Sequence, residues 1–188
     1  MKPCYVIGSG PSLQGFDFDA LPDGYRIGAN KSAWIAKCDA LVTIDKNFWR
    51  NHQSDIAAFN GDKYITAGAL QEQPDLGATI MKHDRGDGFS RVSDTLRGSN
   101  SGFAALNLAY LLGYTEIALL GFDFQWEDGK SHFHDGYHWQ NKMADRHLAT
   151  WCRAFDTIDQ TGLNITNFVG PKGSRVKAFK VRPLSDLV

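Results

Sequence analysis

The sequence has few cysteines. Its 188 residues include three, Cys4, Cys38 and Cys152, which are far apart and odd in number. No two of them have CxxC spacing, and none is paired with a histidine at the spacing of a common zinc site. This pattern argues against the disulfide framework of a small secreted domain. It predicts reduced thiols in a cytoplasmic protein.

An excess of charge and a long apolar run are also absent. The chain carries 20 Lys and Arg against 21 Asp and Glu, a formal net charge of −1. A broad positive field for gripping phosphates is therefore not expected, which argues against general nucleic-acid binding. The apolar start of the chain is too short for a signal peptide, and segment 103–120 is interrupted by Asn107, Gly113 and Glu116. We expect a soluble protein with no membrane span.

The composition is that of an ordinary globular protein. Hydrophobic residues make up 43% and charged residues 22%, and the length fits one domain, 1–188. Short runs rich in Val, Ile and aromatics alternate with helical patterns, which predicts an α/β fold: a Rossmann-like, mainly parallel sheet with helices on both faces. The expected strands are 5–7, 25–29, 40–44, 63–66, 116–120 and 164–168.

Two helices are expected. Segment 100–112 is apolar nearly all round and is followed by Gly113, which predicts a helix buried against the sheet. From about 141 to 159, apolar residues recur at steps of four and three and form one stripe. We interpret Trp151 and Phe155 in this stripe as core packing.

Two further segments have no sustained period. Segment 71–98 contains four glycines and charges of both signs, and a loop of that length predicts a lid or an acceptor-side insertion. The basic C-terminal segment 172–188 carries five Lys and Arg against Asp186 alone. We expect a solvated tail there, the alternative being a local edge that binds anions.

A glycine turn follows the first expected strand and reads Gly8-Ser9-Gly10-Pro11-Ser12-Leu13. Glycines allow a tight turn and close backbone approach, while a helix start offers N–H groups to a phosphate. Pro11 suits the first helical position and Ser12 can donate a hydroxyl. The motif is neither GxGxxG nor a Walker P-loop. It predicts a nucleotide phosphate site of another type.

Small polar residues stand at the ends of other expected strands. Asn30, Asp45 and Asp123 follow three of them, and Asn100-Ser101-Gly102 precedes the buried helix. Ligands bind outside the carboxyl ends of strands in such sheets. Asn30 and Asp45 are candidates for contacts to a ribose or base, and Ser101 for a second phosphate. Each is equally explained as a turn or capping residue.

A histidine-rich segment, 121–139, has the highest density of titratable groups. His132, His134 and His138 lie within seven residues. Histidine titrates near neutral pH, so this cluster predicts a general base, a general acid or contacts to a leaving group. A metal site is the second interpretation, because His132 and His134 are two apart, but the spacing fixes no third ligand.

The order of these motifs resembles the bacterial sialyltransferases that use CMP-sialic acid. The glycine turn, Asn30, Asn100-Ser101-Gly102 and Gly121-Phe122-Asp123-Phe124 occur in the order seen there. They are also found in that order in the motility-associated flagellin glycosyltransferases, in the archaeal 6-hydroxymethylpterin diphosphokinase-like domain and in small phage-encoded proteins. The segment 128–134 is most similar to the last two groups, so the resemblance is to small phage members in particular. It implies the cytoplasm of a bacterium or of a phage-infected host cell.

The resemblance also implies roles for residues. Nucleotide contacts fall to Gly8, Ser9, Gly10, Ser12 and Asn30. Ser101 would face the phosphate or donor sugar, and Asp123 with Phe124 would line the site. In the sialyltransferases a tyrosine after this strand contacts the leaving phosphate, and His132 stands near its place here. His138 matches their histidine base, with His134 and His147 as rivals. The sialyltransferases have Asn where this chain has Asp45. The identities of the nucleotide base and of the donor sugar are therefore left open.

Three functions follow from these observations. The first is a glycosyltransferase that takes a nucleotide-activated sugar, with CMP-sugar as one type, an unknown hydroxyl acceptor and no required metal. The second is Mg²⁺-dependent transfer of diphosphate from ATP to a small alcohol, with the metal on Asp45 and Asp123, or with His132 and His134. The third is a nucleotide-binding module without catalysis. A homo-oligomer is compatible with each.

Overall fold

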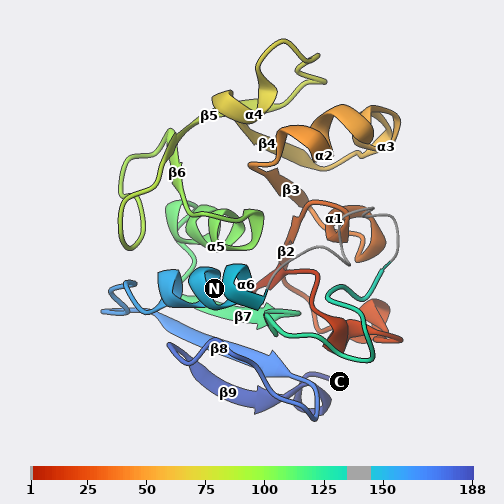
Figure 1. The fold of residues 1–188 in the computed structure, drawn as a ribbon, viewed down its shortest axis with the longest axis vertical. Helices are drawn as coiled ribbons and strands as arrows, with labels where there is room; N and C mark the ends of the chain where they lie inside the picture. Colours follow the sequence, from red (N-terminus) through yellow and green to blue (C-terminus); the bar gives the residue numbers. More distant parts are fainter. Residues whose placement is uncertain (1, 135–144) are drawn as a thin grey trace.

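The computed structural model describes residues 2–134 and 145–188, whose strands and helices are shown in Figure 1. Its centre is a sheet of nine strands in the order β6-β5-β4-β3-β2-β1-β7-β8-β9, and every neighbouring pair is parallel. The expected Rossmann-like parallel sheet is confirmed. The strands are β1 Cys4–Ile7, β2 Tyr25–Ala29, β3 Ala40–Thr43, β4 Asp62–Thr66, β5 Thr79–Asp84, β6 Thr95–Arg97, β7 Glu116–Leu120, β8 Asn164–Val169 and β9 Lys180–Pro183.

Helices cover both faces of the sheet, as expected. Two long helices, α5 Ser101–Leu111 and α6 Asp145–Phe155, pack on one face, and four short ones pack on the other. Successive residues of β1 therefore enter different cores: Val6 packs with the first set and Ile7 with the second. The short helices are α1 Ser32–Ile35, α2 Lys46–Asn51, α3 Gln53–Ala58 and α4 Ala67–Leu70, with 3-10 turns η1 Pro11–Leu13, η2 Phe18–Ala20 and η4 Leu184–Asp186.

The helix α5 begins and ends where the sequence indicates. The side chain of Asn100 caps its first turn, and Gly113, at φ 85°, follows its end in a left-handed conformation that glycine adopts without strain. It is the central helix of its face, and it contacts β1, β2, β3 and β6. The second expected helix corresponds to α6. Within it, Leu148, Cys152 and Phe155 are buried.

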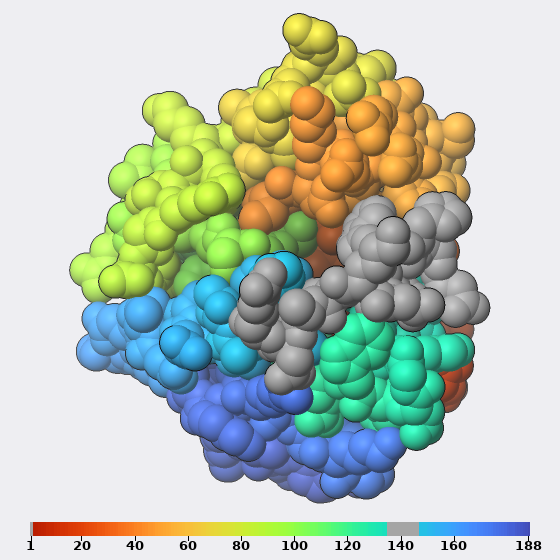
Figure 2. Space-filling model, in the orientation of Figure 1, coloured from red at the N-terminus to blue at the C-terminus, as the bar shows by residue number. Residues whose placement is uncertain are grey.

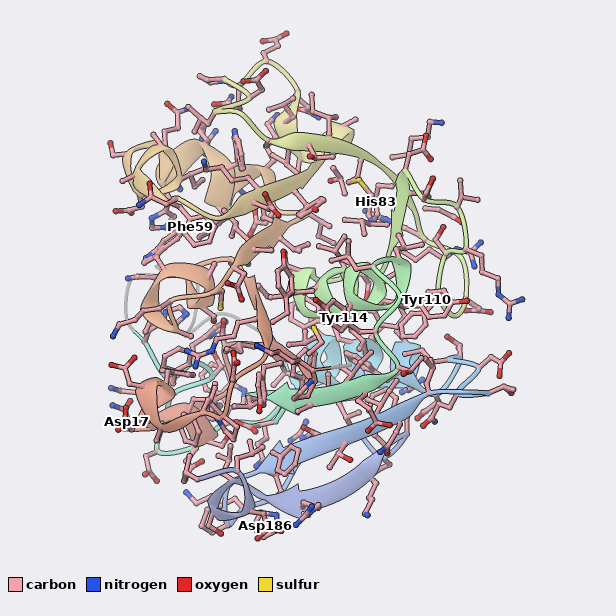
Figure 3. All side chains as sticks on the ribbon, turned by 180° about the vertical axis from the view of Figure 1, so that it is seen from behind. Asp17, Phe59, His83, Tyr110, Tyr114 and Asp186 are labelled. Carbon is pink, nitrogen blue, oxygen red and sulfur yellow. The ribbon has the colours of Figure 1, made fainter. Side chains whose placement is uncertain are left out.

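All six expected strands are present, and the sheet has three more. Segment 71–98 contains β5 and β6, which extend the sheet to one edge, so it is not an irregular loop throughout. Its role as a lid stays a prediction. The expectation of a solvated tail at 172–188 is wrong, because β9 pairs with β8 along its whole length. Figure 3 shows β7, β8 and β9 at one end of the sheet and β4 and β5 at the other.

The strand order reverses between β1 and β7. From β1 the chain adds β2 to β6 on one side, and from β7 it adds β8 and β9 on the other. Such a switch point leaves a crevice outside the carboxyl ends of its two central strands, where open α/β sheets bind ligands. Here the residues that follow these strands are Gly8 and Gly121. None of the helices in the described ranges is long and apolar enough to cross a membrane.

Candidate functional site

A cavity of about 680 Å³ lies at the carboxyl ends of the strands. Its walls come from the segments that follow β1, β2, β3, β4, β5 and β7, from the start of α5 and from one side of α6. Figure 2 shows the hollow between the orange residues around α2, the yellow-green residues of 85–98 and the blue of α6. Its size suits a small organic ligand.

Most of the residues singled out in the sequence meet in this cavity. Ten of them line it: Gly8, Ser9, Gly10, Asn30, Asp45, Asn100, Ser101, Gly102, Phe124 and His132. Pro11, Ser12, Asp123 and His134 are not among the lining residues, although His134 contacts Ser9. His138 lies outside the described residues. His147 is exposed on α6.

The glycine turn after β1 packs against the end of β7. The amides of Gly8 and Gly10 donate to the carbonyls of Leu120 and Gly121, each at 2.8 Å. A Cβ on Gly8 would come within 2.6 Å of the Gly121 oxygen, so this close approach requires glycine. These two amides are therefore not available to a phosphate, and η1 is a single 3-10 turn with little dipole to offer.

The side chain of Asp123 fixes this turn through hydrogen bonds. It is fully buried, and its two carboxylate oxygens accept hydrogen bonds from the amide and the hydroxyl of Ser12, both at 2.7 Å. Burial raises the pKa of Asp123 to about 6, against the opposing effect of the two Ser12 hydrogen bonds. The geometry thus gives Asp123 and Ser12 a structural role at the switch point instead of a place in the cavity.

The start of α5 forms one wall of the cavity. Asn100 Oδ1 accepts from the Phe103 amide at 2.9 Å, while its Nδ2 is buried without a partner in the described structure. The first amides of a helix have no acceptor within it, so the amides of Ser101 and Gly102, two residues that line the cavity, can donate to a ligand. The positive end of the helix dipole adds to them. This wall is built to hold an anion.

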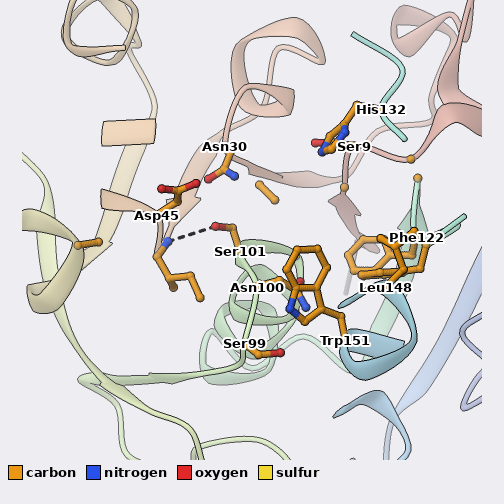
Figure 4. A pocket seen from close by; sticks show the side chains of 18 of the residues that line it. Ser9, Asn30, Asp45, Ser99, Asn100, Ser101, Phe122, His132, Leu148 and Trp151 are labelled. Atoms are coloured by element: carbon orange, nitrogen blue, oxygen red, sulfur yellow. Dashed lines mark hydrogen bonds between the residues drawn. The ribbon is translucent and has the colours of Figure 1, made fainter. Parts of the chain in front are cut away.

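Two neighbouring side chains complete this wall. The Ser101 hydroxyl accepts from the Ile44 amide at 3.2 Å, which fixes the end of β3 against α5 (Figure 4). Asn30 follows β2 at φ 53°, and its Oδ1 is buried without a partner in the described structure. An unpaired acceptor on Asn30 and an unpaired donor on Asn100 both belong to residues lining one cavity. A buried polar atom without a partner is costly, and a ligand can satisfy both.

Asp45 has the capping role that its residue type indicates. Its Oδ1 accepts from the amides of Asn47 and Phe48, at 2.8 and 3.1 Å, and begins α2. It also lines the cavity, whereas Asp123 does not. The structure therefore does not bring the two aspartates together as a magnesium pair. No group of three or more His, Cys, Asp or Glu suited to a metal ion occurs in ranges 2–134 and 145–188.

His132 is a neutral group of the cavity. Its Nδ1 lies 2.8 Å from the Ser131 hydroxyl, and burial, aided by the nearby His134, lowers its pKa to about 4. At pH 7 it exchanges hydrogen bonds and carries no charge.

The hydrogen bonds around Ser9 assign the proton of His134. The Ser32 hydroxyl donates to the Gly8 carbonyl at 2.7 Å, so the 3.0 Å contact between Ser9 and Ser32 is donated by Ser9. The Ser9 oxygen can then accept, and His134 Nε2, at 3.4 Å, is the donor. In this state His134 Nε2 cannot take a proton from an acceptor.

Some lining residues escaped the sequence analysis. Trp151, interpreted as core, is half-buried and faces the cavity from α6 (Figure 4), because an apolar stripe does not show which of its members lie at a rim. Lys46, His83 and Arg85 also line the cavity. His83 and Arg85 lie at the end of β5, a strand that the sequence pattern did not predict.

Comparison with known proteins places the fold. No family model and no curated protein sequence matches the chain. Among solved structures, the sialyltransferase CstII from Campylobacter jejuni with the substrate analogue CMP-3FNeuAc is similar, with TM-score 0.56 and 17% identity over 97% of this chain and 87% of that chain. The same enzyme with cytidine-5′-monophosphate gives TM-score 0.57 and 17% identity, covering 97% and 86%. The chain therefore has a sialyltransferase-like α/β fold.

Proposed function

We propose that this protein is a glycosyltransferase that takes a nucleotide-activated sugar, and that a CMP-sugar is the donor to test first. The observation that carries the proposal is the start of α5, where the unpartnered Nδ2 of Asn100 and the first helical amides face a 680 Å³ cavity. The similar enzyme has been solved with CMP and with a CMP-sugar analogue, which supports this choice of nucleotide.

The donor phosphate is assigned to the start of α5. Anions bind at helix N-termini because free amides and the dipole act together. Asn100 Nδ2 would add a third donor. Asn30 Oδ1 would accept from a hydroxyl or amino group of the donor, which removes the second unpaired atom of the cavity. The sequence analysis expected one phosphate on the glycine turn and a second at Ser101, and this assignment keeps the second position.

The transfer step needs a base and a leaving-group contact. The acceptor oxygen attacks the anomeric carbon, the bond from that carbon to the phosphate oxygen breaks, and the nucleotide leaves with the electron pair. His138 remains the proposed base for the acceptor proton. Neutral His132 is proposed to hydrogen-bond the departing phosphate, a contact that gains strength as charge develops. His134 is the weaker candidate because its Nε2 donates to Ser9.

The diphosphokinase alternative gains no support from the site. Both carboxylate oxygens of Asp123 accept from Ser12, so they are committed away from the cavity. A metal would have to rely on Asp45, of which one oxygen caps α2. Transfer from ATP and simple nucleotide binding are therefore outcomes that the test below must separate.

The decisive variant is Asn100→Asp. An aspartate keeps the oxygen that caps α5, and the positive end of the helix dipole favours its charge, so we expect the variant to stay folded, which urea unfolding checks. It also replaces the Nδ2 donor with negative charge beside the proposed phosphate. We expect affinity for CMP to fall about a hundredfold. Asn60→Asp makes the same charge change at an exposed site and should bind CMP like the wild type.

Calorimetry with CMP, UDP and ATP, with and without Mg²⁺, and release of CMP from CMP-N-acetylneuraminic acid are the measurements. Metal-independent CMP binding, lost in Asn100→Asp, together with release of CMP supports the proposal. Binding and consumption of ATP only with Mg²⁺ would overturn it in favour of the diphosphokinase. Tight CMP binding without turnover of any donor or acceptor would leave a binding module.

A further inference from the structure

The cavity extends well past the residues that the donor is proposed to use. It runs under the ends of six adjacent strands, from β7 through β1 to β5, a span of about 24 Å at the usual strand spacing. The donor contacts occupy the part between β7 and β3. At the far end the walls are Lys46, Thr66, Gly68, Ala69, His83 and Arg85.

Positive charge gathers at this far end. The Arg85 side chain forms no hydrogen bond or ion pair with any residue in the described part of the chain. The carboxylate of its neighbour in sequence, Asp84, pairs with Arg97 at 2.7 Å and accepts a hydrogen bond from the Arg85 backbone amide, but it does not pair with the Arg85 guanidinium. Lys46 bonds the neutral amide of Gln71, so its charge is not compensated there. Against these two cations stands one carboxylate, Asp45.

His83 is held in a fixed position beside them. Its Nε2 lies 2.8 Å from the Gly98 carbonyl, which can only accept, so Nε2 carries a proton. His83 and Arg85 are two residues apart on an extended segment and share one side of it. Two cations and an oriented imidazole thus line this end of the cavity, and Asp45 is the one carboxylate among the lining residues.

We propose that this end of the cavity, the Lys46–Arg85 subsite, binds a second anionic group of the substrate, a carboxylate or a phosphate. The assignment of the group to a donor sugar or to an acceptor rests on the proposed function. Arginine suits either oxyanion because its planar guanidinium donates two parallel hydrogen bonds. A neutral sugar would supply no charge to balance the two cations.

Arg85→Gln tests the subsite, with Arg91→Gln as its matched control. Arg91 lies in the same segment and is exposed. It pairs with Asp159 at an N···O distance of 3.3 Å, and it does not line the cavity. Both variants lose one positive charge. Because the Arg85 side chain is exposed and bonds no described residue, Arg85→Gln is expected to fold normally. Loss of one charged hydrogen-bond donor weakens binding about ten- to hundredfold.

Two arms separate the sources of the anion. In the first, calorimetry compares CMP, which lacks a second anionic group, with CMP-N-acetylneuraminic acid, whose sugar carries a carboxylate. In the second, initial rates compare lactose with sialyllactose as acceptors. A loss in Arg85→Gln confined to the CMP-sugar places the anion on the donor; a rise in KM confined to sialyllactose places it on the acceptor. Either result supports the subsite.

A third measurement does not depend on the proposed function. Inorganic phosphate is titrated into the protein, and the backbone amide resonances of Gly68 and Arg85 are followed with those of Gly102. We expect two phosphate sites in the wild type and in Arg91→Gln, and the loss of the shifts at Gly68 in Arg85→Gln. If Arg85→Gln matches Arg91→Gln in all three measurements, the subsite is overturned. If CMP fails to bind while phosphate shifts Gly68, only the proposed function falls.

Discussion

The pKa values of two residues near the switch point, the buried Asp123 and the half-buried His132, are shifted in opposite directions. Burial raises the pKa of Asp123 to about 6, so the native state binds a proton there that the unfolded chain has already lost above pH 4. Burial lowers the pKa of His132 to about 4, so the unfolded chain binds a proton that the native state refuses. Their effects on stability oppose each other over nearly the same pH range.

The variant Asp123→Asn separates these effects. Wild-type Asp123 makes folding less favourable as pH rises from about 4 to 6, because its charge must be buried. An asparagine in its place keeps the shape and can still hydrogen-bond Ser12, and it has no charge to bury. We expect the free energy of unfolding of Asp123→Asn, relative to wild type, to rise by about 2 to 3 kcal/mol between pH 4 and pH 7. Urea unfolding across this range is the measurement.

His132→Gln supplies the opposite sign as a control. Wild-type His132 lowers stability as pH falls from about 6.5 to 4, and glutamine removes that loss. Relative to wild type, the His132→Gln variant should gain stability toward low pH while Asp123→Asn gains it toward high pH. Parallel curves for wild type and Asp123→Asn would show that the carboxyl is not ionised against burial.

The helix α5 connects the cavity to the added strands. Its first turn lines the cavity, and Asn107, two turns later, is fully buried. Asn107 Oδ1 accepts from the amides of Ser90 and Arg97, at 3.1 and 2.9 Å, and its Nδ2 donates to the Ser90 carbonyl at 3.2 Å. One side chain thus ties the middle of the loop between β5 and β6 to the end of β6.

Asn107→Leu should release this loop. Leucine has the same branching but leaves the amide and carbonyl of Ser90 and the amide of Arg97 unpaired, so we expect a loss of about 2 to 4 kcal/mol in the free energy of unfolding. Hydrogen exchange should speed up at the amides of Ser90 and Arg97 before it does so in β1. Asn60→Leu, at an exposed position, is the control. Unchanged exchange at Ser90 would show that α5 does not hold the loop.

The nine elements of the sheet differ in how visibly the sequence marks them. The central strands are buried on both faces, so β1 and β3 are short apolar runs, and such runs predict strands directly from the sequence. In β5, Met81 is buried while Ile80 and Lys82 are exposed, and β9 is exposed along its length. Their pairing with β4 and β8 is a tertiary effect, which a local pattern does not contain.

The topology of the whole molecule explains why much of the site was visible in the sequence. Parallel strands carry their following residues to one edge, so Gly8, Asn30, Asp45 and Ser101 converge although they are far apart in the chain. Residue types alone did not reveal which way each side chain points. Asp123 and Ser12 turn toward each other below the turn, whereas Trp151 turns toward the cavity, and these outcomes depend on packing between distant elements.

The edge strand β9 bears on self-association. At the outer edge, β9 has Lys180 and Pro183 at its ends, and both side chains are exposed. Lysine and proline on an edge strand oppose pairing with another chain, because one adds charge and the other lacks an N–H donor. If the protein forms a homo-oligomer, we therefore expect it to use another surface.

Replacing both residues should open this edge. We expect Lys180→Val with Pro183→Val to self-associate in a concentration-dependent way, since Val181 beside them is already 48% exposed and the strand then resembles an unprotected edge. Sedimentation velocity measures the mass of the variant against wild type. The control replaces Arg50 and Arg91, on a helix and in a loop, with valine and should keep the wild-type mass. If the control associates as strongly as the β9 variant, added surface hydrophobicity explains the result and edge protection by β9 does not.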